Sequence, residues 1–423
     1  MAQLTDDCFA FSGSLLPIAE MERLIEAGVG PVAEIEDVSL SAALGRVLAR
    51  DLVADLDLPP FDNSAVDGFA VRHGDLAHEG ETRLAIVDRV AAGAAAARAL
   101  GRGEAVRIFT GAPMPAGADT VFMQEDVRVE GGAVIVPPGL KFGANRRLAG
   151  EDVRRGAVTL PAGRRLAARD VALAAAVGVA ALPVRRRVRV AVFSTGDEVV
   201  EPGAPRGPNA IYDANRYLLS GLLTKFGAEV ADLGIVADDP AALRKTLAQA
   251  AVGRDLVLSS GGVSTGEADH MRTVLEEVGR LVFWRVAIKP GRPVAMGTLP
   301  GGAAGSAAFV GLPGNPAAVF VTFVRVVRPL LLRLAGAEPD PLVPLPVRAA
   351  FSYRKRKGRR EYVRVALRAA ADGAVEAVKF AREGAGVITS LTETAGLVEL
   401  FEDVTTVEPG STVGFLPYAA LAD

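Results

Sequence analysis

The stretch DLVLSSGGVSTGEAD, residues 255–269, decides the fold class of this chain. It begins as an apolar run of strand-forming residues and continues as a loop of glycines, serines and acids. In open α/β sheets, ligands bind in the crevice at the carboxyl ends of the strands. Consecutive small residues let backbone N–H groups converge on an oxyanion. The stretch therefore predicts a strand that ends at a binding crevice.

The composition of this loop excludes two common phosphate-binding motifs. It lacks the Gly-Lys-Ser/Thr ending of a Walker loop, and its glycine spacing differs from that of the dinucleotide fingerprint. Its candidate oxyanion-binding residues are Ser260, Gly261, Gly262 and Ser264. Asp269 adds a carboxylate of the kind that divalent cations prefer.

Strand and helix patterns alternate on both sides of this stretch. VRVAVFSTGDE (188–198) predicts a strand that ends in a polar loop, and NRYLLSGLLTKFG (215–227) predicts an amphipathic helix closed by Gly227. PAALRKTLAQA (240–250) and the long apolar segment after Pro316 predict further helices. This alternation favours a central, doubly wound α/β domain over residues 186–336.

The rest of the chain divides into three further predicted parts. Residues 59–148 carry short alternating strands with Gly/Pro turns, which indicates a β-rich inserted module. Residues 1–58 plus 149–185 form a discontinuous helical and mixed domain, with helices expected at 18–28, 39–51 and 168–177. After a Pro-rich linker, residues 343–423 alternate as strands of a small all-β, barrel-like domain.

Composition narrows the class of protein. The net charge of −3 and the pI of about 5.9 provide no general attraction to nucleic acid or to an anionic membrane. The only cysteine, Cys8, excludes a disulfide within the chain, and the three histidines match no zinc motif. The longest apolar run, 171–184, is shorter than a membrane span. We expect a soluble, cytoplasmic protein without nucleic-acid or membrane partners.

Acidic loops follow two of the predicted strands. STGDEV contains Asp197 and Glu198, whose oxygens suit a hard cation such as Mg²⁺, although for this motif alone a helix cap with a solvated turn is slightly favoured. VADDP contains Asp238 and Asp239 immediately before a proline, which is a common helix start. We expect one of these two aspartates to serve only as a cap.

Two other loops suit anions. IKPGRP places Lys289 and Arg292 around a turn, where two cations fit phosphate or another tetrahedral oxyanion. GLPGNP, which contains Pro313, Gly314 and Pro316, leads into a helix whose first N–H groups are free to donate. Ordinary turns and simple helix initiation remain the alternatives.

Several segments carry weaker signals when each is considered alone. RIFTGAPMPAGAD (107–119) and NRRLAGEDVRRG (145–156) resemble surface turns, and the basic run YRKRKGRREY (353–362) is typical of a solvated hairpin. Acidic and anion-binding loops nevertheless recur at the strand ends of one α/β domain. The residues by themselves therefore indicate Mg²⁺-dependent chemistry on a phosphorylated or oxyanionic small molecule.

Seven motifs, in order, carry a family resemblance. They are PFDNSAVDGFAVR, RIFTGAPMPAGAD, GEDVRRG, FSTGDE, SSGGVSTGEAD, AIKPGRP and GLPGNP. Together they resemble the molybdopterin molybdenumtransferases, the family of the MoeA proteins and the gephyrin E domain. The resemblance extends from about residue 15 to the C-terminus. Arg285 and Arg292 stand where lysine is frequent in the family, and Val66 and Phe69 where methionine and tyrosine are common.

The resemblance implies a reaction and a set of roles. The family inserts molybdenum from molybdate into adenylylated molybdopterin and releases AMP, with a divalent cation, as an elongated homodimer. A molybdopterin adenylyltransferase supplies the adenylylated substrate. The implied catalytic residues are Asp67, Thr110, Asp152, Glu198, Asp238 and Asp269, with Glu198, Asp238 and Asp269 as metal ligands. Lys289, Pro313 and Pro316 match other positions of the site.

Two alternatives remain open from the sequence. The α/β domain alone also resembles the stand-alone molybdopterin adenylyltransferases, although these lack the FDNSAVDGFA and FTGAPMP segments. A non-catalytic cofactor-binding or scaffold protein of the same fold is the other alternative.

FDNSAVDGFA (61–70) contains two aspartates of different expected use. We expect Asp67 to belong to the active site. Asp62 and Asn63 are expected to shape the turn by local side-chain bonds to the backbone. Because this loop lies far from the α/β domain in sequence, we expect it to reach that crevice from the second subunit of the dimer.

Overall fold

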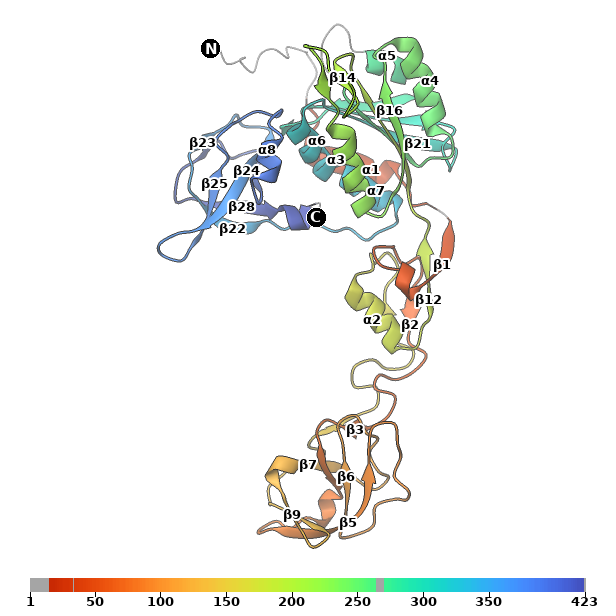
Figure 1. Ribbon diagram of the computed structural model, residues 1–423, viewed down its shortest axis with the longest axis vertical. Helices are drawn as coiled ribbons and strands as arrows, with labels where there is room; N and C mark the ends of the chain where they lie inside the picture. Colours follow the sequence, from red (N-terminus) through yellow and green to blue (C-terminus); the bar gives the residue numbers. More distant parts are fainter. Residues whose placement is uncertain (1–14, 33, 264–269, 422–423) are drawn as a thin grey trace.

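The computed structural model describes residues 15–32, 34–263 and 270–421. Figure 1 shows an elongated molecule, in which an α/β unit and a C-terminal β unit lie side by side at one end. Two smaller units follow one another away from them. We call the nearer one the middle unit (β1, β2, β11, β12 and α2) and the farther one the distal module (β3 to β10). Together they form the arm, residues 35–185.

The α/β unit is built on a six-stranded sheet in the order β16-β13-β17-β21-β20-β18. Its first four strands are parallel, whereas β20 and β18 add an antiparallel edge. The predicted doubly wound α/β domain is therefore confirmed, with a mixed sheet. The strands are β13 (Arg189–Thr195), β16 (Glu229–Val236), β17 (Leu256–Ser260), β18 (Arg280–Arg285), β20 (Pro293–Pro300) and β21 (Ser306–Leu312).

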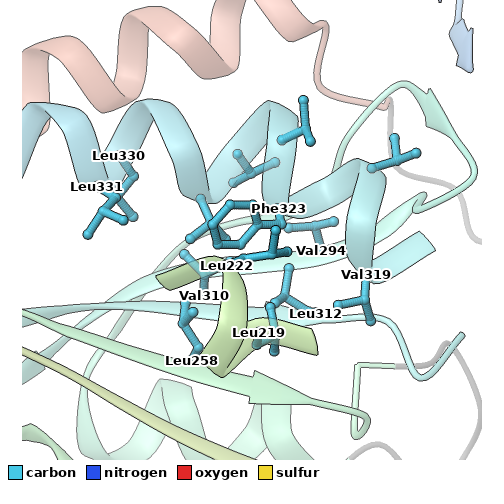
Figure 2. Close-up of a cluster of buried hydrophobic side chains, with 14 of the residues drawn as sticks. Leu219, Leu222, Leu258, Val294, Val310, Leu312, Val319, Phe323, Leu330 and Leu331 are labelled. Carbon is cyan, nitrogen blue, oxygen red and sulfur yellow. The ribbon is translucent and has the colours of Figure 1, made fainter. Parts of the chain in front are cut away.

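Helices cover both faces of this sheet. One face packs against α1 (Ile18–Gly28), α3 (Asn215–Lys225), α6 (Pro316–Thr322) and α7 (Arg328–Leu334). The other face packs against α4 (Pro240–Ala251) and α5 (His270–Val278). Figure 2 shows the first core, where Leu219 and Leu222 of α3 meet Leu258 and Val310 of the sheet. The central strands are buried on both sides, which explains their continuous apolar sequences.

The predicted long helix after Pro316 is one continuous helical segment in three parts. A π-helical turn, η4 (Phe323–Val327), connects α6 to α7. Pro316 occupies the first turn of α6, where a missing N–H costs no hydrogen bond. The segment packs its Val, Leu and Phe side chains against the sheet.

The middle unit is small and mostly extended. β1 (Ile35–Ser39) pairs with β12 (Ala181–Arg185), β2 (Leu52–Val53) pairs with β11 (Val158–Leu160), and α2 (Ala168–Ala176) covers them. The helix expected at 39–51 is wrong. Only a 3-10 turn, η1 (Leu40–Ala42), forms there, because Val47 and Leu48 instead bridge to Arg165 and Val184 in extended conformation.

The distal module is a β structure, as its sequence predicted. Its main sheet has the order β7-β4-β6-β5-β9-β8, and a two-stranded pair, β3 with β10, lies beside the chain entry. The strands are β3 (Asn63–Ser64), β4 (Gly68–Val71), β5 (Thr82–Val90), β6 (Glu104–Ile108), β7 (Thr120–Met123), β8 (Arg128–Glu130), β9 (Ala133–Val136) and β10 (Arg146–Arg147). The 3-10 turns η2 (His73–Asp75) and η3 (Gln124–Asp126) complete it.

The C-terminal unit is a closed five-stranded barrel, because β24 pairs with both β25 and β26. One strand of the α/β unit, β19 (Ile288–Lys289), pairs with β24 and joins the two units. The barrel strands are β22 (Leu345–Ala349), β24 (Arg360–Ala369), β25 (Val375–Lys379), β26 (Gly396–Leu400) and β28 (Thr412–Pro417). The barrel unit also has the shorter elements β23 (Tyr353–Arg354), β27 (Thr406–Val407), α8 (Thr389–Thr392) and α9 (Tyr418–Leu421). The α/β unit has two further short strands, β14 (Val199–Val200) and β15 (Ile211–Tyr212).

The four-domain division predicted from the sequence stays a prediction. One observation bears on where we would place a limit: Ile18, Met21 and Ile25 of α1 are buried in the core of the α/β unit. We therefore propose to group α1 with that unit, although it precedes the arm in sequence.

Candidate active site

The carboxyl ends of three parallel strands meet at one edge of the central sheet. Their register places Ser194 of β13 beside Ser260 of β17, and Ser260 beside Leu312 of β21. The three candidate loops, STGDE, SGGV and LPGNP, follow these positions directly. The sheet thus brings the sequence-predicted loops together at one crevice, as the position of ligand sites in such folds requires.

Two glycines make the close packing of these loops possible. Gly261 has a φ of +89°, and a Cβ built on it would lie 2.2 Å from the carbonyl oxygen of Thr195. Gly262 has a φ of +67°, and its Cβ would lie 2.8 Å from the Thr195 methyl group. Residues with a side chain rarely adopt such φ values, so both positions require glycine. The backbone of the loop is therefore held against the end of β13.

Buried polar atoms without partners gather at this edge. They are Ser194 Oγ, Thr195 Oγ1, Asn215 Oδ1, Asp238 Oδ1 and Ser259 Oγ, none of which has a hydrogen-bond partner in the described part of the chain. Buried polar atoms are nearly always paired in folded proteins, because an unpaired one costs free energy. A group of them at the carboxyl ends of parallel strands is typical of a site that a polar ligand completes.

Asn215 was not among the residues predicted from the sequence. It begins α3, and its Nδ2 donates to Ser260 Oγ (2.9 Å) and to the carbonyl oxygen of Gly314 (2.8 Å). It therefore connects the predicted residues of two loops, while its Oδ1 stays unpaired. Its place at the start of a helix resembled ordinary helix initiation, so the sequence carried no separate signal for it.

Asp238 and Asp239 separate as expected. Asp239 caps α4, since its carboxylate accepts from the N–H groups of Ala241 and Ala242. Burial raises the pKa of Asp238, and the nearby carboxylates of Asp197 and Glu198 raise it further, against the opposing effect of His270. Of Asp238 and Asp239, Asp238 is therefore the one that does not cap the helix, and its carboxyl group lies near other acidic side chains.

The described residues fit a divalent cation only in part. Asp238 offers an unpaired oxygen, and Glu198 is an exposed acid beside it. Within residues 15–32, 34–263 and 270–421, however, no group of three or more metal-ligating side chains is assembled. Asp269 and Ser264 lie outside the described residues, so their predicted roles stay predictions.

A cavity of about 390 Å³ lies between the α/β unit and the barrel. Lys289, Arg292 and Pro313 line it from the α/β unit, as the predicted anion-binding loops require. The barrel adds four cations that the sequence did not identify: Arg359, Arg364, Lys379 and Arg382. The cavity adjoins the crevice at residues 313–315. Pro313 and Asn315 line the cavity, and the carbonyl oxygen of Gly314 between them accepts from Asn215 of the crevice.

Arg364 is a cation of this cavity that is almost completely buried. Its side chain is only 9% exposed, and burial lowers the pKa of its guanidinium. Nη2 donates to the carbonyl oxygen of Gly384 at 3.1 Å, whereas Nε has no partner among the described residues. A buried cation with unused donors is suited to a bound anion.

Glu361 holds other cations of the cavity in place. This carboxylate is fully buried and lies 3.6 Å from Lys289 Nζ. It also accepts from Arg359 Nε (2.7 Å) and from the Tyr353 hydroxyl (2.8 Å). The expectation that the basic run 353–362 is a solvated hairpin is therefore wrong, because Lys355 and Arg359 are buried in it.

Asp67 and Thr110 form a pair in the distal module. The Thr110 N–H and hydroxyl both donate to Asp67 Oδ1, at 2.8 and 2.7 Å. The backbone bond from Thr110, followed by its hydroxyl bond, lowers the pKa of Asp67. The strand after Asp67 begins with Gly68, where a Cβ would lie 1.7 Å from the carbonyl oxygen of Phe122. The loop therefore presents an ionised carboxylate at the surface.

Asp62 makes different contacts from those expected. It accepts from the Ala149 N–H at 2.8 Å and from Arg146 Nε at 3.0 Å, both remote in sequence. The expected local bond exists only for Asn63, whose Nδ2 donates to the carbonyl oxygen of Phe61 at 3.2 Å. Asp62 therefore joins the two chain segments that enter and leave the distal module.

The predicted site residues fall into two groups that one chain does not bring together. Asp67, Thr110 and Asp152 belong to the arm, and the first two lie in the distal module at the far end of the molecule in Figure 1. Glu198, Asp238, Ser260, Gly261, Gly262, Lys289, Arg292, Pro313, Gly314 and Pro316 belong to the α/β unit. Their roles in catalysis and binding remain predictions.

Fold and site together define a class: a multidomain α/β protein with a crevice and an adjoining cavity suited to an oxyanionic small molecule. Three family models match the chain in order. They are the MoeA N-terminal region (domain I and II) over residues 16–178, a probable molybdopterin binding domain over 191–333, and the MoeA C-terminal region (domain IV) over 346–418. The chain belongs to the MoeA family.

Individual relatives agree with this assignment. A Haemophilus influenzae protein named molybdopterin molybdenumtransferase is 37% identical over 387 residues, which cover 91% of this chain and 94% of the relative. A Nostoc protein of the same name is 43% identical over 307 residues, or 72% and 70% of the two chains. The crystal structure of a molybdopterin biosynthesis MoeA protein from Pyrococcus horikoshii superposes with a TM-score of 0.80 at 30% identity, covering 96% and 100%.

Proposed function

We propose that this protein is a molybdopterin molybdenumtransferase. It takes adenylylated molybdopterin and molybdate, inserts molybdenum at the dithiolene and releases AMP, which is the last step of molybdenum-cofactor biosynthesis. The observation that carries the proposal is the crevice with its unpaired buried polar atoms next to a cavity lined by cations. Relatives that span more than two thirds of the chain bear the name of this activity, which favours it over an adenylyltransferase or a scaffold.

The proposal assigns the two substrates to neighbouring places. The phosphates of adenylylated molybdopterin would bind at the turn around Gly262. The neighbouring N–H groups of Gly261 and Ala317 already donate to the carbonyl oxygens of Leu312 and Ala385. Molybdate, a tetrahedral dianion, would bind in the cavity, where Lys289, Arg292 and Arg364 supply charge. Because the Pro313–Asn315 segment borders both places, the two substrates would lie side by side.

We further propose that the reaction depends on Mg²⁺. Asp238 and Glu198 would hold the ion together with Asp269. The chemistry that the bound ion supplies is neutralisation of the charge on the phosphates. The unpaired oxygen of Asp238 supports this assignment, because an unpaired carboxylate among other acids gains most from a cation.

The proposed enzyme acts as a homodimer with active sites shared between subunits. Asp67 and Thr110 lie in the distal module, remote from the crevice of their own chain (Figure 1). A second copy placed head-to-tail would bring its distal module to the crevice and complete both sites. The adenylylated substrate would come from a molybdopterin adenylyltransferase. We expect the enzyme to work in the cytoplasm; no helix in the described residues is long and apolar enough to cross a bilayer.

The test is direct. The purified protein is incubated anaerobically with adenylylated molybdopterin, molybdate and Mg²⁺, and AMP and the molybdenum-bound product are measured. We expect release of AMP that depends on molybdate and is reduced by removal of Mg²⁺. AMP release no higher than in a control without protein would refute the proposed activity.

A binding experiment tests the oxyanion cavity separately. Arg364→Ala should weaken molybdate binding by about tenfold, because it removes a buried cation whose donors are not fully used. Arg382→Ala is the matched comparison at the same cavity, and Arg102→Ala, an exposed arginine of the distal module, is the control. Equal affinities for molybdate in all three variants would show that molybdate does not bind in this cavity.

A further inference from the structure

The arm joins the α/β unit through a pair of strands and several further contacts. The chain enters and leaves the arm through the antiparallel pair of β1 and β12. Two strands alone are a weak restraint, since an isolated pair of strands is at best marginally stable in water. The angle of the arm therefore depends on whatever else connects the middle unit to the α/β unit.

One such connection is at the C-terminal end of α3, and another joins the Glu338 N–H to the carbonyl oxygen of Gly163 at 2.8 Å. Arg165 of the middle unit lies with its guanidinium 4.9 Å from the ring centre of Phe226 and donates from Nη2 to the carbonyl oxygen of Lys225 at 3.0 Å. Arg187, the second residue after β12, donates to the carbonyl oxygen of Gly227 at 3.0 Å. Carbonyls at a helix C-terminus lack helical partners and carry partial negative charge, so cations bind there favourably.

The α/β unit supports the same ring from its own side. Arg328 of α7 lies 5.8 Å from the centre of Phe226, and Phe323 packs on it at 5.9 Å. Arg328 is held by Asp340 in the linker that leads to the barrel. Burial lowers the pKa of Arg328, and Asp340 opposes this effect. The cleft that Arg165, Arg187 and Phe226 line has a volume of only about 20 Å³, so this part of the joint is closely packed.

Helix α3 connects this joint to the crevice. Its last turn and the residue after it bear the contacts to Arg165, and its first residue, Asn215, donates to Ser260 and Gly314 in the crevice. A helix of eleven residues packed along the sheet is a rigid element. The arm is thus attached to the same helix that forms one wall of the crevice.

We propose that Arg165, Phe226 and Arg328 form a clamp that sets the angle of the arm, which makes Arg165 a positioning residue for Asp67 and Thr110. The catalytic part of this inference rests on the proposed function, in which the distal module completes the crevice of the partner subunit. Asp67 belongs to the distal module, which the middle unit separates from the joint (Figure 1), so a rotation at the joint is amplified into a larger displacement of that module. Misplacement of a catalytic group by about 1 Å can reduce turnover by as much as 100-fold.

The clamp is tested by a distance measurement on the full-length protein. Spin labels are placed at Glu79→Cys in the distal module and Lys245→Cys on α4, in a Cys8→Ser background. Excess unlabelled protein ensures that each dimer carries one labelled subunit. We expect a narrow distribution of distances without further substitutions and a distribution at least about twice as wide in Arg165→Ala, because domains without a large interface move relative to one another.

Matched variants separate the clamp from a general loss of structure. Arg165→Lys keeps the charge but loses the planar stacking on the ring, so we expect an intermediate width. Arg169→Ala, an exposed arginine on α2 of the same unit, should leave the distribution unchanged. If Arg165→Ala fails to fold, Phe226→Leu removes the stacking surface of both arginines without a change of charge. Unchanged distances in Arg165→Ala and in Phe226→Leu would overturn the clamp.

Kinetics test the positioning role. In Arg165→Ala, kcat for AMP release should fall by about tenfold while the affinity for molybdate stays the same, since the oxyanion cavity is remote from the joint. A widened distribution with unchanged kcat would overturn the positioning role. If the unsubstituted enzyme releases no AMP, the proposed function fails, whereas the distance measurement still decides whether the clamp exists.

Discussion

At the scale of single residues, Asp62 and Asp67 show how one loop uses the same side chain in two ways. Asp62 is bonded to Ala149 and Arg146 and joins the two ends of the distal module. Asp67 is bonded through one oxygen to Thr110 and lies at the surface. Local sequence separated the two only by the glycine that follows Asp67, so the partners of Asp62 could not be predicted.

The contacts of Asp62 predict a local loss of stability. Asp62→Ala should cost about 1 kcal/mol, a small value for a charged hydrogen bond because the ion pair is partly screened by water. Hydrogen exchange at β3 and β10 should therefore become about fivefold faster. Asp67→Asn should leave exchange at these strands unchanged. Equal rates for Asp62→Ala and the unsubstituted protein would contradict this role.

The stability that the contacts of Asp62 contribute should depend on pH. The bond from Ala149, and then the Arg146 side chain against the effect of burial, hold the pKa of Asp62 below its ordinary value of 3.8. A carboxyl group with a lowered folded-state pKa stabilises the fold above the unfolded value and loses this effect as the pH falls through the folded value. The difference between Asp62→Ala and the unsubstituted protein should thus be full at pH 7 and shrink on acidification below 3.8.

For Asp238 we expect the opposite effect of pH on the stability of the fold. Its pKa is raised, chiefly by burial, so the fold retains a proton there that the unfolded chain releases as the pH rises above the ordinary value of 3.8. The ionised side chain therefore destabilises the fold at neutral pH. Asp238→Asn should raise the melting temperature by on the order of a degree at pH 7, with no gain below the ordinary pKa, and should abolish Mg²⁺-dependent AMP release.

Calorimetry with and without Mg²⁺ checks this prediction. Mg²⁺ should stabilise the unsubstituted protein and have less effect on Asp238→Asn, because a ligand that binds only the folded state raises its stability. Asp239→Asn is the control for a helix cap and should lower stability instead. A lower melting temperature in Asp238→Asn would show that the carboxylate has a stabilising partner.

At the scale of elements, periodicity and glycine placement predicted most of the α/β unit. The apolar runs of β13 and β17, the stripe of α3 and the proline at the start of α6 all appear where expected. The segment 39–51 failed, because its apolar spacing fits a helix but Val47 and Leu48 pair with remote segments. The mistaken interpretation of the basic run 353–362 also arises from contacts with remote segments: Glu361 and the barrel bury two of its cations, Lys355 and Arg359.

The loop after β17 allows a test of element geometry. Gly261→Ala should destabilise the α/β unit by about 1–3 kcal/mol, because the new Cβ would meet the Thr195 carbonyl in a conformation with positive φ. Gly314→Ala is the matched control for stability, since no atom lies within 4 Å of the position that its new Cβ would take. Thermal unfolding measures both. Similar melting temperatures for the two variants would show that the loop can move away from β13.

At the scale of the whole molecule, a shared active site predicts complementation between subunits. Asp67→Asn and Glu198→Gln should each be inactive as homodimers. A heterodimer of the two, isolated with two different affinity tags, has one site with both residues intact and should show about half of the normal activity. AMP release measures the result.

A second heterodimer supplies the control. It pairs an unsubstituted chain with a chain that carries both Asp67→Asn and Glu198→Gln. If sites are shared, each site of this heterodimer lacks one residue, and it should be inactive. If each chain instead holds a complete site, the first heterodimer should be inactive and the second should show about half of the normal activity.

The sequence by itself determined the fold class, the loops at the strand ends and the family, because periodicity, glycines and short motifs are local properties of the chain. Only the tertiary structure decided which side chains meet. It brought barrel cations to Lys289, Asn215 to Ser260, and Arg165 to Phe226, and it kept Asp67 away from the crevice. These contacts join residues far apart in sequence, and they depend on packing and charge burial that no short segment encodes.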